Sequence, residues 1–385
     1  MKSITFLLHN IYAVGGTVKT ITNLSNQLVK QGHNVKILTI FKTKKTPYFH
    51  LDHRVKVEHV INYQLNIRNV IPLCANRIRK FTPFLKPKLL SRFEPGFNQY
   101  SSFIERYLIR AIENDTSDVL IGTRASHNIL IARFAKSQQI TIGMEHMNFT
   151  AHHPQLQKEI VTYYHRLNAI TTLTHEDKAC YASKISRPVF LLPNMIDEKR
   201  HQIMKHKRII SVGRFEYEKG FDLLIEAIYT IQEELREYGY TVEIYGEGRE
   251  KEALGQQINF LRLQDLIALK PATQHINVHL AESRITCVPS RNEGFGMTIL
   301  EAMNQGSVVV SFDGNVGPKS LIKHQENGFL VPHLNAKLLG QQLLEVIEYS
   351  HTPQMKNIIN NAYQTVEKYG PHDIYQQFKS MIQQL

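Results

Sequence analysis

The stretch VPSRNEGFGMTILEAMNQG, residues 288–306, decides how the second half of the chain is interpreted. A β-branched run ends at Ser290, a glycine-rich turn follows, and an apolar pattern of helical period begins near Met297. Glu293 falls in the turn and Glu301 in the helix, so both carboxylates can face one crevice without being adjacent on a helical face. Carboxylates accept hydrogen bonds from vicinal hydroxyls, and the amides of such a turn can receive a charged group. The stretch therefore predicts a strand–glycine–helix binding site.

Similar β-branched runs alternate with stretches of helical period along the whole chain. They cover residues 4–9, 34–40, 118–123, 140–146, 169–174 and 189–194, and then residues 208–214, 241–246, 266–270, 285–290 and 307–314. One helix between them carries Ile21, Leu24 and Leu28 and ends near Gly32. Another carries Leu224, Ile228, Ile231 and Leu235. This alternation predicts two doubly wound Rossmann-like α/β domains joined near residue 200.

The composition is that of a packed, cytoplasmic protein. Among 385 residues, 42% are hydrophobic and 21% are charged, which excludes disordered, collagen-like and coiled-coil chains. Cys74, Cys180 and Cys287 are far apart, have no metal-site spacing and fit a reducing cytosol. The apolar start breaks at His9, and no apolar run reaches the roughly 18 residues of a membrane span. We therefore expect neither a secreted nor a membrane-spanning protein.

Charge is concentrated in the first half of the chain. The 46 basic and 34 acidic residues give a net charge of +12, but residues 1–200 hold 28 basic and 13 acidic residues, a net of +15. Such an excess indicates an anionic partner, with solubility as the alternative. Residues 68–93 carry no acid, three phenylalanines and seven cations, which are Arg68, Arg77, Arg79, Lys80, Lys86, Lys88 and Arg92. This segment predicts either peripheral contact with an anionic membrane or an ordinary solvated insertion.

Three further positions lie where strands end and ligands bind in open α/β sheets. Gly15 and Gly16 precede the first helix. They form either a tight turn or a site whose exposed backbone amides bind an anion or a substrate hydroxyl. Arg214 and Lys219 flank the first loop of the second half and provide two donors suited to a diphosphate, unless Glu216 or Glu218 pairs with them. His146 ends the run ITIGMEH and is either functional or structural; its neighbour Glu145 is a competing candidate.

With these segments identified, the sequence resembles the retaining glycosyltransferases of family 4 (group 1), which have the GT-B architecture of two Rossmann-like domains facing a central cleft. The motifs that carry the resemblance are GGTVKTITNLSNQLVKQGHNVKILT at the N-terminus, Gly213-Arg214 followed by Lys219-Gly220, IYGEGRE, and above all EGFGMTILEAM. It implies an acceptor-binding domain over residues 1–196, a linker over 197–207, a nucleotide-sugar-binding domain over 208–368, and a C-terminal helix, 369–385, that crosses back to the first domain.

The resemblance also assigns roles to individual residues. Arg214 and Lys219 would hold the donor diphosphate, Glu301 the nucleotide ribose, and Glu293 the sugar hydroxyls. His146 would contact the sugar near its reacting carbon. The resemblance further implies that the residues closing around the donor are Gly213, Gly294, Phe295, Gly296, Met297 and Thr298, and that Gly15 and Gly16 lie at the acceptor edge. No metal or other cofactor is expected, and no Asp-x-Asp pair for a nucleotide-bound Mg²⁺ is present.

The reaction implied is transfer of a hexose or N-acetylhexosamine with retention, the leaving phosphate helping to deprotonate the acceptor hydroxyl. We favour a UDP-sugar, although Leu269-Lys270-Pro271 stands where relatives often have a Leu-Gly pair beside the base. The basic first half favours a lipid-linked or phosphate-rich acceptor, such as a teichoic-acid or capsule precursor. The alternatives are a GT-B nucleotide-sugar epimerase, a non-catalytic partner subunit, and a nucleic-acid binder, for which no recognition motif is present.

Overall fold

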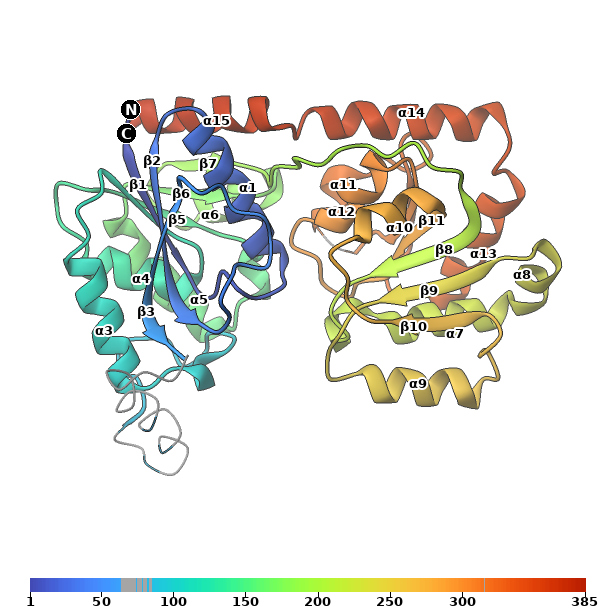
Figure 1. Ribbon diagram of the computed structural model, residues 1–385, viewed down its shortest axis with the longest axis horizontal. Coiled ribbons are helices and arrows are strands. Elements are labelled where there is room, and N and C mark those ends of the chain that lie inside the picture. Colours follow the sequence, from blue (N-terminus) through green and yellow to red (C-terminus); the bar gives the residue numbers. More distant parts are fainter. Residues whose placement is uncertain (64–73, 75–77, 79–81, 83–84, 315) are drawn as a thin grey trace. The chain divides into compact units, whose positions relative to one another are not determined.

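The computed structural model describes residues 1–63, 74, 78, 82, 85–314 and 316–385. The chain divides into two compact units (Figure 1): unit 1 holds Met1–Met195 together with Pro371–Leu385, and unit 2 holds Ile196–Gly370. Each unit is built on one parallel sheet. The doubly wound α/β fold predicted from the alternating pattern is confirmed in both units.

Unit 1 contains a seven-stranded sheet of order β3-β2-β1-β4-β5-β6-β7. Its strands are β1 Ser3–Leu8, β2 Asn34–Lys42, β3 Lys56–Asn62, β4 Val119–Gly122, β5 Ile140–Met144, β6 Ala169–Thr172 and β7 Val189–Leu191. Its helices are α1 Gly16–Lys30, α3 Ser102–Glu113, α4 Ala125–Phe134, α5 Pro154–Tyr163, α6 His175–Ala182 and α15 Pro371–Gln384. The C-terminal helix α15 belongs to this unit and lies beside α1.

Unit 2 contains a six-stranded sheet of order β10-β9-β8-β11-β12-β13. Its strands are β8 His206–Val212, β9 Thr241–Tyr245, β10 Ile267–Lys270, β11 Ser283–Val288, β12 Val308–Phe312 and β13 Phe329–Val331. Its helices are α7 Phe221–Thr230, α8 Gln232–Tyr238, α9 Lys251–Phe260, α10 Ile276–Glu282, α11 Met297–Asn304, α12 Val316–Leu321, α13 Ala336–Glu348 and α14 Pro353–Glu367. Short 3₁₀ turns precede several helices, among them η6, Tyr217–Lys219.

Some expected boundaries were wrong. The helix predicted to carry Leu224 through Leu235 is two helices, because the backbone leaves helical geometry at Ile231. The Thr230 hydroxyl donates to the Ala227 carbonyl at 2.7 Å, a local bond that competes with helix continuation. Ile231 and Leu235 are buried all the same. The run ITIGMEH is a strand only to Met144, which leaves Glu145 and His146 in the following loop.

The segment predicted as a linker, residues 197–207, packs against unit 2. The side chains of Asn304 and Gln305 donate to the carbonyls of Glu198 and Lys199, at 3.0 and 2.9 Å. The strand β8 begins within the same segment, at His206. These hydrogen bonds give the backbone of this connection partners inside unit 2, so it is not a free linker.

Both sheets reverse their strand order at one point, between β1 and β4 in unit 1 and between β8 and β11 in unit 2. At such a switch point the following helices leave on opposite faces, and a crevice opens beyond the carboxyl ends of the two strands. The loops after β1, β4, β8 and β11 are therefore where each unit is built to bind a ligand.

Candidate active site

Three loops pack together at the switch point of unit 2. The Phe215 amide, after β8, donates to the Glu247 carbonyl, after β9, at 2.9 Å, and the Gly213 amide donates to the Tyr245 carbonyl at 3.0 Å. A Cβ on Gly246 would lie 1.9 Å from the Gly213 carbonyl oxygen, so only glycine permits this contact. The IYGEGRE motif thus supports the loop that carries Arg214, whose side chain is exposed.

The loop after β11 is tied to the loop after β8 by Arg291. Its guanidinium donates to both carboxylate oxygens of Asp222, at 2.7 and 2.6 Å, and to the Tyr217 carbonyl at 2.9 Å. It also lies 3.9 Å from the centre of the Tyr217 ring, and its backbone amide donates to the Glu218 carbonyl at 2.8 Å. A two-pronged charge-assisted pair of this kind fixes direction as well as distance.

This arrangement brings Lys219 and Glu293 together. The Lys219 ammonium donates to a Glu293 carboxylate oxygen at 2.6 Å, and the Ser290 hydroxyl donates to the same oxygen at 3.3 Å. The two charged side chains are 23% and 18% exposed, so solvent still reaches the pair. Between them, Gly220 adopts φ +65°, and a Cβ there would lie 2.0 Å from the Pro289 carbonyl oxygen. The close approach of the two loops requires this glycine.

The alternative pairing considered for the two cations was wrong for Lys219. Glu216 instead accepts from the Arg249 guanidinium at 3.0 and 2.6 Å, and that pair is largely exposed on the Arg249 side. In the part of the chain that the structure describes, the Arg214 side chain makes no hydrogen bond or ion pair. Its guanidinium is therefore the freely presented cation of this loop.

The other predicted donor residues lie at the start of α11. Gly296 adopts φ +98° and precedes the first helical residue, Met297, while the first turn contains no acidic side chain. The helix therefore presents amide hydrogens and the positive end of its dipole without a built-in counter-charge. Phe295 is buried and packs edge-on against Tyr369, with ring centres 5.7 Å apart. The structure places Gly294 and Thr298 directly on either side of this turn, half-buried.

Glu301 lies on the buried side of α11 and is 6% exposed. It is in the second turn of the helix, whereas Glu293 is in the loop before it, as the spacing predicted. A carboxylate that is nearly sheltered from water accepts hydrogen bonds more strongly than an exposed one.

In unit 1, the switch point presents Gly15, Gly16 and Arg124. A Cβ on either glycine would meet nothing within 4 Å, so crowding inside unit 1 does not explain the glycine pair. Arg124 follows β4 and is 33% exposed; its guanidinium donates to the Pro95 carbonyl at 3.0 Å and lies 3.9 Å from a Glu94 oxygen. Open space around the glycines leaves room for another molecule to approach this edge of the sheet.

His9, beside Arg124, is neutral at physiological pH. His9 follows β1, and its two ring nitrogens contact the Tyr100 hydroxyl at 2.7 Å and the side-chain amide oxygen Oε1 of Gln99 at 2.9 Å. Burial lowers the pKa of His9 to about 4, and the Arg124 charge lowers it further. His9 is therefore neutral at physiological pH, whereas the Arg124 guanidinium beside it carries positive charge.

His146 lies in the loop after β5, one strand from the switch point. Its Nε2 is buried and has no hydrogen-bond partner among the described residues. Burial lowers the pKa of His146 to about 4, opposed by Glu145 and assisted by Arg124. The side chain is thus a neutral imidazole with one ring nitrogen unsatisfied, an arrangement that a native interior rarely leaves without a purpose.

The competing candidate Glu145 is part of a buried network. It accepts from the Asn128 amide at 2.8 Å, from the Tyr164 hydroxyl, and from the His152 ring at 3.3 Å. Burial alone would raise the pKa of Glu145, but the His152, Tyr164 and Asn128 contacts hold it below its ordinary value. Because its oxygens are taken by these partners, Glu145 has a structural role. His152 is buried in the same network, as expected for a structural histidine.

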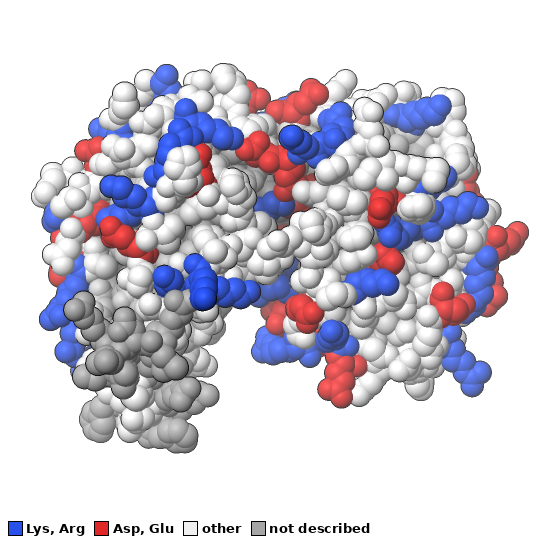
Figure 2. All heavy atoms as spheres, in the orientation of Figure 1, with Lys and Arg blue, Asp and Glu red and all other residues white. Residues whose placement is uncertain are grey.

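The basic segment 68–93 lies largely outside the described residues. Its described end, residues 85–93, is anchored by Glu105, whose carboxylate accepts from the backbone amides of Lys88, Leu89 and Leu90 at 2.6–2.9 Å. On the face drawn in Figure 2, the basic side chains stand in separate groups with acidic ones among them. Within the residues that can be described, no helix is long and apolar enough to cross a membrane. Membrane contact by residues 68–93 remains a prediction.

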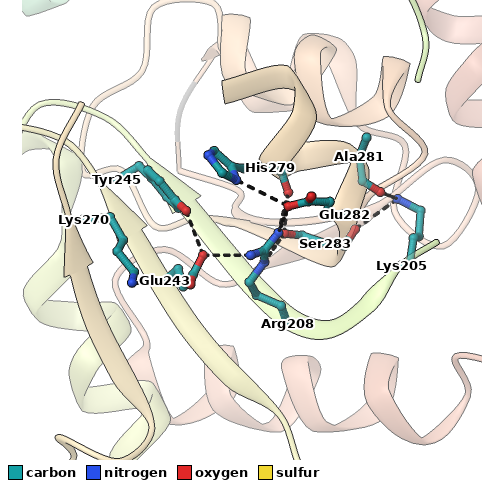
Figure 3. A network of polar contacts seen from close by, with 9 residues as sticks. All are labelled: Lys205, Arg208, Glu243, Tyr245, Lys270, His279, Ala281, Glu282 and Ser283. Carbon is teal, nitrogen blue, oxygen red and sulfur yellow. Dashed lines mark hydrogen bonds and ion pairs between the residues drawn. The ribbon is translucent and has the colours of Figure 1, made fainter. Parts of the chain in front are cut away.

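Lys270 ends β10 and belongs to a polar network behind the donor loops (Figure 3). Arg208 joins Glu243 and Glu282 through hydrogen bonds of 2.9 Å each, and the Lys270 ammonium lies 3.8 Å from Glu243. Burial and the Glu243 hydrogen bond raise the pKa of Tyr245 to about 12. These charges are mutually compensated, so the network holds β8, β9 and α10 in register.

Sequence reasoning missed Arg291, Asp222 and Arg124. Arg291 stands inside the stretch that decides the fold, but nothing near it in sequence identifies Asp222 as its partner, 69 residues away. Arg124 directly follows a predicted strand, and that position was a usable signal. Over the described ranges, no group of three His, Cys, Asp or Glu side chains is placed to hold a metal.

Two parallel-sheet α/β units with these loops at their switch points have the architecture of the GT-B glycosyltransferases. An S. aureus TarM mutant, solved with fondaparinux, alpha-GlcNAc-glycerol and UDP, matches 99% of both chains with a TM-score of 0.78 at 16% identity, which shows the fold.

Comparison of the sequence with those of known proteins points to one group of glycosyltransferases. Residues 195–365 match the family model for glycosyl transferases group 1. An uncharacterized glycosyltransferase of Haemophilus influenzae is 26% identical over 400 residues, 99% of this chain and all of that protein. A poly(glycerol-phosphate) alpha-glucosyltransferase of Bacillus subtilis is 25% identical over 221 residues, 55% of this chain and 32% of that protein. These matches support placing the chain among the group 1 glycosyltransferases.

Proposed function

We propose that this group 1 glycosyltransferase transfers a hexose or N-acetylhexosamine, with retention, from a UDP-sugar to a hydroxyl of a phosphate-rich or lipid-linked cell-envelope acceptor. The observation that carries the proposal is the contact between Lys219 and Glu293, beside the exposed Arg214 and the uncompensated N-terminus of α11. These groups supply fixed cations, a carboxylate and amide donors in one crevice. A nucleoside diphosphate sugar requires all three.

On this proposal, Arg214 and Lys219 bind the diphosphate and offset the charge that grows on it as it leaves. Lys219 has three N–H donors, so it can keep Glu293 and still bind a phosphate oxygen. Glu293 accepts hydrogen bonds from the sugar hydroxyls, and Glu301 from those of the ribose. Residues 294–298 close around sugar and phosphate. Preorganised donors of this kind stabilise developing charge without rearranging during the reaction.

The reaction is a same-face substitution at the anomeric carbon. The bond from this carbon to the diphosphate oxygen breaks, the bond to the acceptor oxygen forms, and the acceptor proton passes to the leaving phosphate. An oxocarbenium-like state lies between these events, with no covalent enzyme intermediate. The neutral His146 imidazole contacts the sugar near its reacting carbon. No metal is required in this scheme.

The acceptor is assigned to unit 1 because Arg124, 33% exposed, carries positive charge there beside the neutral His9 and His146. Gly15 and Gly16 leave open space beside it. The name of the Bacillus subtilis relative gives its substrate as poly(glycerol-phosphate). An acceptor that carries phosphate along its length fits this name and the Arg124 cation. Peripheral contact with an anionic membrane would bring a lipid-linked form of it within reach.

The donor is tested first by thermal shift with UDP, GDP, ADP and their common sugar conjugates, in the presence of EDTA. A ligand present at about 100 times its Kd stabilises the protein by about 2.7 kcal/mol, which gives a readable shift. We expect a shift with the UDP series. No shift with any nucleotide would refute the donor site, and a shift that needs added Mg²⁺ would refute metal independence.

The transfer itself is tested with the UDP-sugar that binds and a poly(glycerol-phosphate) acceptor, with the anomeric configuration of the product read by NMR. Release of UDP should require the acceptor, and the product should keep the donor's configuration. Turnover of the sugar without acceptor would favour the epimerase. Arg124→Gln should raise KM for the polyanionic acceptor about tenfold, the loss expected for one charge-assisted contact, and leave UDP affinity unchanged.

A further inference from the structure

A cavity of about 290 Å³ opens at the edge of the unit 2 sheet opposite the donor loops. Ile285 and Val308 line it near the amino ends of β11 and β12, and Val346 and Ile359 line it from α13 and α14. The donor loops follow the carboxyl ends of the same strands, so the two sites are separated by the length of a strand, roughly 17–20 Å. The cavity does not belong to the proposed active site.

The polar wall of this cavity is basic. Arg284 and Lys205 both line it, together with Ser350 and His351. The Arg284 guanidinium donates to the His351 ring at 2.9 Å, and its buried Nε has no hydrogen-bond partner among residues the structure describes. Across the described ranges, no acidic side chain forms an ion pair with Arg284 or Lys205. A half-buried guanidinium normally has such a counter-charge, because leaving it unpaired is costly.

Lys205 strengthens the positive potential without being the direct ligand. Its ammonium donates to three backbone carbonyls, those of Ala281, Ser283 and Gln305, at 2.9–3.0 Å, and Figure 3 shows it turned toward Ala281. Its three donors are therefore fully used. Burial lowers the pKa of Lys205 to about 8, and repulsion by the Arg284 charge contributes to the lowering. The two cations therefore repel each other.

We propose that this cavity binds a small organic anion whose carboxylate pairs with Arg284 and whose short apolar body lies against Ile285, Val308, Val346 and Ile359. The anion supplies the missing counter-charge to the Arg284 guanidinium that lines the cavity, and its apolar part covers the aliphatic wall. The volume is about ten times the roughly 30 Å³ of a water molecule. Its volume matches a ligand of about that many non-hydrogen atoms.

The cavity is bordered by both chain segments that lead out of unit 2. Lys205 ends the stretch that follows Met195, and Ile359 lies on α14, which precedes α15 of unit 1. A ligand here contacts both connections at once. Because the cavity lies away from the donor loops, it should bind its ligand whether or not those loops bind a nucleotide sugar.

Sodium hexanoate titrated into the full chain tests the proposal, with saturation-transfer NMR and thermal shift as the readouts. Hexanamide, which has the same chain and no charge, is the ligand control. We expect saturable binding of hexanoate at millimolar concentration, no comparable binding of hexanamide, and no displacement by saturating UDP. Absence of hexanoate binding, equal binding of hexanamide, or displacement by UDP would each overturn the proposal.

Two variants locate the site. Arg284→Gln should weaken hexanoate about tenfold or more, the effect of losing one charge-assisted pair, whereas Arg262→Gln, an exposed arginine of the same unit, should have no effect. Ser350→Trp places a large side chain in the cavity wall while leaving both cations in the sequence, and it should also abolish binding. If Arg284→Gln fails to fold, the Ser350→Trp variant tests whether hexanoate binds in this cavity. Hexanoate affinity that is unchanged in Ser350→Trp would refute the assignment.

Discussion

Replacing Arg291 with alanine should disable the donor site without unfolding the protein. Arg291 contacts no part of the proposed substrate; it holds the loop of Glu293 against the loop of Lys219 through Asp222 and the Tyr217 carbonyl. Without it, the Glu293 loop loses its side-chain attachment to η6. The distance between the Lys219 ammonium and the Glu293 carboxylate, 2.6 Å in the intact protein, is then no longer imposed.

The expected loss of stability is modest. Hydrogen bonds to charged groups contribute about 1.5–3 kcal/mol each when sheltered, but Asp222 is 41% exposed and solvent screens the pair. We therefore expect a loss of about 1–2 kcal/mol, which lowers the melting temperature of a unit of this size by about 2–4 °C for each kcal/mol. At 25 °C nearly all of the variant remains folded, since native domains have about 5–15 kcal/mol to lose.

The expected loss of activity is larger than the stability change can explain. A displacement of about 1 Å at a catalytic group can lower the rate about a hundredfold. We expect kcat/KM for sugar transfer to fall at least tenfold, a loss of about 1.4 kcal/mol in transition-state binding. Asp222→Ala should lose about as much, and the double variant no more than either, because both changes break one contact.

Arg236→Ala is the matched control. Arg236 forms the same two-pronged pair with Asp265, at 2.8 and 3.2 Å, in the same unit but away from the donor loops. It should lose a similar amount of stability and keep its activity. If kcat/KM of Arg291→Ala stays within about twofold of Arg236→Ala, a difference of only about 0.4 kcal/mol, the positioning role is refuted.

Three other outcomes follow from the described contacts. A Cβ at Gly16 would meet no atom within 4 Å, so Gly16→Ala should keep full stability while slowing transfer. Gly220→Ala, at φ +65°, should instead lower the melting temperature. Normal transfer by Gly16→Ala would show that Gly16 has no role at the acceptor edge. Glu301→Ala should weaken UDP binding in a calorimetric titration, and unchanged affinity would remove the ribose contact. Burial lowers the pKa of His146 to about 4, against about 6.5 in the unfolded chain. The free energy of unfolding should therefore fall as the pH drops from about 6.5 toward 4, and this residue alone should account for about 1–2 kcal/mol at pH 5. Urea unfolding of His146→Gln should show a smaller loss over the same pH range.

The strands and helices with strong patterns could be predicted from the sequence, and those with weak patterns could not. The predicted runs correspond to eleven of the thirteen strands in the part of the chain that the structure describes. The strand β3, KVEHVIN, lies at the sheet edge with mostly polar or half-exposed side chains, so it lacks the β-branched run of an interior strand. The strand β13 has only three residues. The break at Ile231 is set by backbone geometry that the hydrophobic period does not record.

The site was predictable as a set of residues but not as a set of contacts. The motif identified Lys219 and Glu293 as neighbours of one crevice, because each follows a strand of a parallel sheet. It did not identify them as partners, since Glu216 and Glu218 are far closer in sequence. The pairing follows from the adjacency of β8 and β11, which depends on the strand order. Strand order is decided by long-range packing, to which local periodicity is insensitive.

The two switch points differ in how their charge is held, and this difference fits the division of labour that we propose. In unit 2 the Lys219 ammonium is oriented by Glu293 before any ligand arrives, which limits the entropy lost when a diphosphate binds. In unit 1 burial keeps His9 and His146 neutral, so Arg124 acts without competing protons through the physiological pH range. A donor must be held in one geometry for the sugar to react, whereas a polymeric acceptor must slide and be released. The oriented pair suits the first task. Arg124, which lies 3.9 Å from Glu94 and is still 33% exposed, suits the second.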